Sequence, residues 1–259
     1  MLESLEALVG SISALQFALT GGAVFFAGFL RGFVGFGAAL VIVMVLSVAF
    51  GPAVAVPVAN LSGLPATLQL LPTAVRDSER RFVVSFGLGT FIGAPIGAWI
   101  LIAIEPSLMR MVISAFVLVL VVMIYRGWQF TRHTGPVALA GAGAAAGLVQ
   151  GSAGVSGPMA VVVSLSRPGT AFLQRANVIG TVTALNFCGL LPFWYHGLFT
   201  LEVVMISLMI VPLYSGAIWL GARFFVEGGH RHFRNAALIS LAAIGVVTMI
   251  LAVQDYLAG

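Results

Sequence analysis

Long apolar segments follow one another along almost the whole chain, separated only by short polar stretches. Crossing the ~30 Å hydrocarbon core of a bilayer takes about 20 helical residues. With 60% hydrophobic and 8% charged residues, the sequence predicts an all-α, polytopic integral membrane protein whose single transmembrane domain takes up residues 1–259. Full spans are expected at 51–74, 82–104, 176–195, 202–225 and 236–256, with further apolar segments at 14–31, 33–50, 108–125, 136–151 and 153–166.

Glycines interrupt two of the shorter segments. The stretch "GFLRGFVGFGAAL" occupies 28–40, and "GLVQGSAGVSG" occupies 147–157. Each glycine costs a helix roughly 0.5 to 1 kcal/mol relative to alanine. Unwound backbone at membrane depth is tolerated only where protein or a water-filled cavity surrounds it. We therefore expect segments 33–50 and 153–166 to be half-spans, which makes them broken or re-entrant helices at the centre of the protein.

The two glycine-rich stretches belong to an internal repeat. At a constant offset, "AGFLRGFVGFGAAL" (27–40) matches "AGLVQGSAGVSGPM" (146–159). The match continues into the next polar helix of each half, where it pairs Asn60 with Asn177 and Gln69 with Asn186.

We expect repeats of about five helical elements each, at 14–125 and 136–256. Because five is odd, the second repeat is inverted relative to the first. Inverted repeats with helices broken at equivalent positions are typical of transporters that hold a substrate near the bilayer midplane.

Arginine placement gives the orientation. All 12 basic residues are arginines, and the formal charge of +4 is too small and too dispersed for a nucleic-acid surface. Placing the loops at 76–81, 126–133, 166–175 and 227–234 inside puts ten arginines on the cytoplasmic side and one, Arg110, outside. Both termini then lie outside.

The glycine breaks are candidate anion sites. A helix that begins just after Gly37, or at Gly157, presents free N–H groups and the positive end of its dipole, and both favour an anion. We assign Gly35, Gly37, Gly154 and Ser156 to such a site. Gly28 and Gly32, four residues apart, fit close helix packing equally well.

Polar side chains within the apolar segments have two interpretations. Their donors suit the oxygens of an anion, but the same groups also form hydrogen bonds between membrane helices. Arg31, whose repeat mate is Gln150, either faces substrate or snorkels to the cytoplasmic edge. Arg175 is either at the cytoplasmic mouth or a positive-inside anchor. The remaining candidates are Asn60, Thr67, Gln69, Asn177, Thr183 and Asn186.

Other chemistry has less support in the sequence. "GVSG" at 154–157 fits a serine nucleophile, so an intramembrane serine protease using Ser156 is an alternative, although every histidine lies in a loop or at a span end. No metal, nucleotide or other cofactor motif is present. Each of the eight acidic residues lies at a terminus, in a loop or at a span end, so we expect uniport of an anion without a proton relay.

Several motifs together resemble the TauE/SafE sulfite exporter family. They are G-x-x-x-G-x-x-G-x-G near the start, its copy half-way along, "GAPIGA" at 93–98 and a second-half helix rich in Asn. Ala38 and Ala39, and Ser156 and Pro158, depart from the family pattern and leave the substrate open.

The resemblance implies a secondary transporter that exports sulfite or an organosulfonate across the bacterial inner membrane, with both termini periplasmic. The alternative is an uptake permease for another small anion such as a carboxylate. The expected partners are the anionic substrate and membrane lipid. No cofactor or nucleic acid is expected, and the oligomeric state is open.

Overall fold

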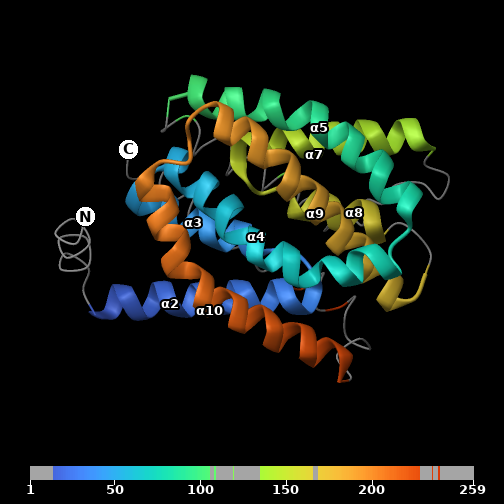
Figure 1. The fold of residues 1–259 in the computed structure, drawn as a ribbon, viewed down its shortest axis with the longest axis horizontal. Helices are drawn as coiled ribbons and strands as arrows, with labels where there is room; N and C mark the ends of the chain where they lie inside the picture. The colour runs from blue at the N-terminus through green and yellow to red at the C-terminus, as the bar shows by residue number, and fades with distance from the viewer. Residues whose placement is uncertain are drawn as a thin grey trace.

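The computed structural model describes residues 14–105, 135–165 and 169–227, with the single residues 108, 119, 235 and 239. Within these ranges all regular secondary structure is helical, which confirms the all-α prediction. The helices, labelled as in Figure 1, are α2 (Ala14–Val34), α3 (Ala38–Phe50), α4 (Pro52–Asp77), α5 (Arg80–Ala103), α7 (Pro136–Ala153), α8 (Gly157–Leu165), α9 (Ala171–Tyr195) and α10 (Leu201–Val226).

Four of these helices are long and apolar enough to cross a membrane: α4, α5, α9 and α10. They coincide with four of the five full spans expected from the sequence, and together with the all-helical fold they confirm a polytopic membrane protein. The fifth expected span, 236–256, and the apolar segment at 108–125 lie outside the described residues.

The two predicted breaks are present. Helix α2 ends at Val34 and α3 begins at Ala38, while α7 ends at Ala153 and α8 begins at Gly157. Helix α3 has 13 residues and α8 has 9, so they are about 20 and 14 Å long, less than the hydrocarbon thickness.

The two breaks follow different backbone paths. Gly35, Gly37 and Gly154 have φ of +97°, +95° and +69°, a region that favours glycine. Ser156, which the sequence aligns with Gly37, has no positive φ, because in the described part of the chain only glycines do.

The helices form three layers (Figure 1). Helices α2 and α10 lie side by side on one side, α5 and α7 on the opposite side, and α3, α4, α8 and α9 between them. Each outer pair joins the first long helix of one half to the last described helix of the other. Two halves related by a two-fold axis would give such an exchange, and the division into two repeats stays a prediction.

Small residues hold the outer pairs together. A Cβ atom on Gly93 of α5 would overlap the main-chain carbonyl of Ala144 on α7. Gly28 and Gly32 face α10 in the same way, so these two glycines serve helix packing. The glycines at the α5–α7 contact are Gly89, Gly93, Gly97, Gly143, Gly147 and Gly151.

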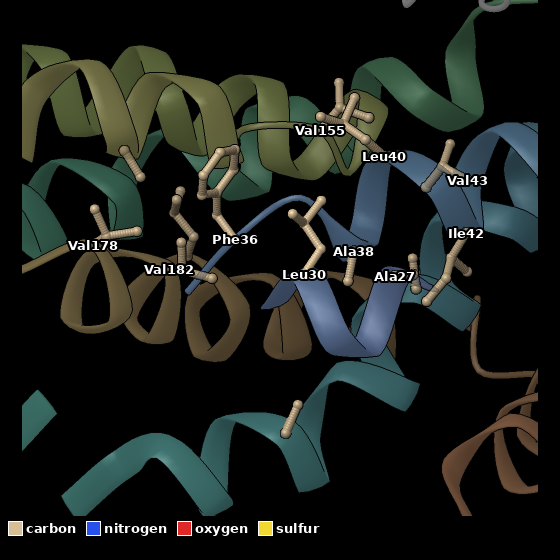
Figure 2. Close-up of a cluster of buried hydrophobic side chains, with 14 of the residues drawn as sticks. Ala27, Leu30, Phe36, Ala38, Leu40, Ile42, Val43, Val155, Val178 and Val182 are labelled. Atoms are coloured by element: carbon tan, nitrogen blue, oxygen red, sulfur yellow. The ribbon is translucent and has the colours of Figure 1, made fainter. Parts of the chain in front are cut away.

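The buried core runs through the central layer and includes both breaks. Figure 2 shows Phe36, on the non-helical connection between α2 and α3, in the same cluster as Val155 of the second break. Large apolar side chains such as Leu88, Ile92 and Trp219 are exposed on α5 and α10, as expected for surfaces that face lipid.

Candidate functional site

The two helix breaks meet at the centre of the protein. A Cβ atom on Gly157 would lie 3.6 Å from the main-chain nitrogen of Gly37, and 3.5 Å from the side chain of Phe36. A Cβ atom on Gly154 would lie 3.3 Å from Val43 of α3. The N-termini of α3 and α8 therefore adjoin each other, and each contributes the positive end of its dipole. In α8, Pro158 has no N–H, and the main-chain nitrogens of Met159 and Ala160 donate to the Ser156 carbonyl.

A small cavity lies where the breaks meet. Its volume is about 30 Å³, room for roughly one or two water molecules. Helices α2, α3, α4, α7, α8 and α9 and both breaks contribute to it. The lining residues are Arg31, Phe36, Gly37, Ala39, Ala59, Asn60, Gln150, Gly154, Ser156, Gly157, Val182, Leu185 and Asn186.

Arg31 supplies the positive charge of this cavity. It is only 6% exposed, so the interpretation that it snorkels to the membrane edge is wrong. Its Nη2 donates to Thr67 Oγ1 over 2.8 Å, and the buried Tyr214 hydroxyl also forms a hydrogen bond with it. Its Nε has no partner. No carboxylate of the described residues pairs with Arg31, so its charge is buried without a counter-ion, which is costly.

Two asparagines continue the network from Arg31. Thr67 Oγ1 accepts from Asn186 Nδ2 over 2.9 Å and donates to the main-chain oxygen of Gly63 over 2.9 Å. Asn60 Nδ2 donates to the main-chain oxygen of Asn186 over 3.3 Å. Asn60 Oδ1 and Asn186 Oδ1 are buried and have no partner among the described residues. One N–H of each amide is therefore used within the protein, and the amide oxygen is not.

Helices α4 and α9 pack reciprocally through these asparagines. A Cβ atom on Gly189 would lie 2.7 Å from Asn60 Nδ2, and one on Gly63 would lie 2.7 Å from Asn186 Nδ2. Asn60 thus contacts Asn186, whereas the sequence alignment matches it with Asn177 as its repeat counterpart. The signal that would have found this pair is N-x-x-G, present as "NLSG" at 60–63 and as "NFCG" at 186–189.

A comparison of the chain with models of protein families identifies its family. Residues 20–248 match the family model described as sulfite exporter TauE/SafE. The chain belongs to the TauE/SafE family. Neither the comparison with curated proteins nor the comparison with solved structures gives a significant match. Membership makes the chain a membrane anion transporter, and the match includes both helix breaks and every residue that lines the cavity.

The second break of this TauE/SafE protein is tied by a side-chain hydrogen bond. The hydroxyl of Ser156 donates to Gln150 Oε1 over 2.5 Å, and both residues are buried at the cavity. A carboxamide oxygen is not a general base, so this contact does not activate Ser156 as a nucleophile. The arrangement favours a structural or ligand-binding hydroxyl over the protease interpretation.

Besides Arg175, four candidates from the sequence lie away from the TauE/SafE cavity. Gly35 faces α9, where a Cβ atom would lie 2.9 Å from Ile179. Asn177 Oδ1 accepts from the main-chain nitrogen of Glu79 over 2.8 Å, just before α5 begins. Thr183 is half-buried on α9 and Gln69 is exposed on α4, and neither lines the cavity.

Arg175 stabilises the end of a broken helix. Its Nε donates to the main-chain oxygen of Phe33 over 2.9 Å and its Nη2 to that of Gly32 over 2.5 Å. The guanidinium carbon lies 4.2 Å from the ring centroid of Phe225. These carbonyls belong to the last turn of α2, whose acceptors have no helical partner. At 4% exposure, Arg175 neither lines the cavity nor anchors the protein at a membrane surface.

Proposed function

We propose that this TauE/SafE protein carries a small sulfur oxyanion, sulfite or an organosulfonate, and that the anion binds where the two helix breaks meet. The observation that carries the proposal is Arg31, a buried cation beside the N-termini of α3 and α8 that has no carboxylate partner among the described residues. Both helix ends and the guanidinium attract the same charge, and their donors suit oxyanion oxygens.

The candidate binding residues fall into three groups. Arg31 supplies charge, and Thr67 and Tyr214 hold its guanidinium in place. Gly37, Gly154 and Gly157 let main chain approach the ligand. Asn60, Asn186, Gln150 and Ser156 line the cavity with polar groups.

A substrate larger than one water requires the cavity to widen. We propose that the short helices α3 and α8 move relative to α4 and α9 as the site opens to one side of the membrane and then to the other. This is the alternating access expected of transporters with inverted repeats.

Export follows from the membrane potential. A cytoplasm that is negative inside favours outward movement of one negative charge by about 2.3 kcal/mol per 100 mV. The acidic residues of the described ranges lie at helix ends or in loops: Asp77, Glu79, Glu105, Glu202 and Glu227. We therefore propose electrogenic uniport across the bacterial inner membrane, with both termini periplasmic.

A flux screen in proteoliposomes tests the proposal. We expect sulfite or a small sulfonate to move, to respond to an imposed membrane potential, and to move nearly as well through Ser156→Ala. Flux of acetate or another simple carboxylate without any flux of sulfur oxyanions supports the carboxylate alternative instead. Complete loss of function in a folded Ser156→Ala reopens the protease interpretation.

A further inference from the structure

Two hydrogen-bond acceptors at the cavity are unused. Asn60 and Asn186 are 2% and 4% exposed, both line the cavity, and the Oδ1 atom of each has no partner in the described part of the chain. Buried polar atoms without partners are rare in native proteins, and each calls for an explanation. A bound ligand that donates hydrogen bonds to these oxygens would explain them.

The orientation of both carboxamides follows from their partners. Asn60 Nδ2 faces the main-chain oxygen of Asn186, which only accepts. Asn186 Nδ2 faces Thr67 Oγ1, whose own proton is donated to the Gly63 carbonyl. Flipping the Asn60 amide would set two acceptors against each other, and flipping that of Asn186 would require the Thr67 hydroxyl to give up its bond to Gly63. The atoms of these two carboxamides that have no partner among the described residues are therefore the oxygens.

The charge at the cavity is a single positive one. Among the described residues, Arg31 is the one charged residue in the lining, and Tyr214 forms a hydrogen bond with it. Arg175 on α9 is directed to the carbonyls of Gly32 and Phe33, and the Cys188 thiol contacts the carbonyl of Gly87. One guanidinium balances one negative charge, whereas a second negative charge on the ligand would stay uncompensated in a buried site.

We infer that this site selects an oxyanion that carries one negative charge and a hydrogen-bond donor, such as hydrogensulfite or a hydroxyalkanesulfonate, over a fully ionised dianion. The inference rests on the proposed function and names the form in which the substrate binds. The anionic oxygens face Arg31 and the helix N-termini, and the ligand's O–H donates to Asn60 Oδ1 or Asn186 Oδ1. A dianion such as ionised sulfite would direct lone pairs at these oxygens instead.

The consequence is that the proton travels with the substrate. Hydrogensulfite is sulfite plus one proton, so moving it across the membrane moves one proton equivalent without a protein group that takes up and releases a proton. Transport without such a protein group agrees with the described part of the chain, where acidic residues lie only at helix ends and in loops.

Calorimetric titration of the purified protein tests the inference in two ways. From pH 5.5 to 8.5 we expect the apparent Kd for total sulfite to rise as hydrogensulfite is depleted, by about tenfold per pH unit once the dianion dominates. Propanesulfonate is a monoanion throughout, so its Kd should stay constant and thereby exclude titration of the protein. At pH 7, isethionate, which has a hydroxyl in place of the terminal methyl of propanesulfonate, should bind about tenfold more tightly.

Two variants test whether Asn60 causes the preference for isethionate over propanesulfonate. Asn60→Leu should reduce the preference for isethionate over propanesulfonate severalfold. Asn177→Leu, a buried asparagine of α9 outside the cavity, should leave the preference unchanged. The wild-type comparison stands even if either variant fails to fold.

The possible results distinguish failure of this inference from failure of the proposed function. Sulfite affinity that is constant or rises with pH, together with isethionate binding no tighter than propanesulfonate, overturns the inference and leaves the proposed function standing. No binding of any sulfur oxyanion at any pH overturns both. If sulfite binds and neither sulfonate does, the pH dependence decides alone.

Discussion

At Gly154 the backbone conformation and the tight space around the residue both disfavour a side chain. Its φ is +69°, and a Cβ atom would lie 3.2 Å from Val56 and 3.3 Å from Val43. A left-handed conformation costs a non-glycine residue about 1–2 kcal/mol.

We therefore expect Gly154→Ala to lower the free energy of unfolding by about 1–2 kcal/mol, and to weaken binding because the cavity reshapes. The matched control is Gly141→Ala, an exposed position within α7 with open space for a Cβ atom. Gly141→Ala should raise the free energy of unfolding by about 0.5–1 kcal/mol. Thermal melting in detergent measures both variants, and equal melting temperatures would contradict this account of the break.

Arg175 is expected to affect stability and not substrate affinity. Lysine cannot reproduce the two hydrogen bonds of the guanidinium to Gly32 and Phe33, so Arg175→Lys should cost about 1.5–3 kcal/mol of stability. Sulfite binding to the folded variant should stay within a factor of about two, because Arg175 does not line the cavity. A parent-like melting temperature together with lost sulfite binding would show that Arg175 acts on the substrate and not on stability.

Among the helices, the two breaks were predictable and the partner of each polar residue was not. Closely spaced glycines act locally, so the sequence shows where α2 and α7 end. The pairing of Asn60 with Asn186 depends on how α4 crosses α9, and the glycine-based alignment missed it because the helices of the two halves do not follow one constant offset. Burial of Arg31 likewise depends on α4 and α10, which supply Thr67 and Tyr214.

The α5–α7 contact should be among the least tolerant of added volume. In Gly93→Ala the new Cβ atom would overlap the carbonyl of Ala144, so the helices must separate, at a cost of about 1–3 kcal/mol. Gly216→Ala on α10, with nothing within 4 Å of its Cβ, is the control. Thermal melting should show a lower midpoint for Gly93→Ala alone. Similar midpoints for the two variants would mean that the α5–α7 contact can accommodate a methyl group.

For the whole molecule, inverted repeats predict that the ends of α4 and α9 lie on opposite sides of the membrane. In a Cys188→Ala background, Asp77→Cys and Tyr195→Cys put single thiols at these exposed ends. A membrane-impermeant maleimide should label Tyr195→Cys in intact spheroplasts, and Asp77→Cys only after permeabilisation. Labelling of both, or of neither, before permeabilisation would contradict inversion, and the reverse pattern would contradict the arginine-based orientation.

The measurement that tests the central claim most directly is sulfite binding to Arg31→Gln by calorimetry at pH 6. Arg223→Gln, at an exposed arginine paired with Glu227, is the control for loss of a positive charge. Charge-assisted hydrogen bonds contribute about 1.5–3 kcal/mol, so Arg31→Gln should bind about 10- to 100-fold more weakly while Arg223→Gln binds as the parent does. Parent-like affinity in a folded Arg31→Gln would show that the anion does not bind where the two helix breaks meet.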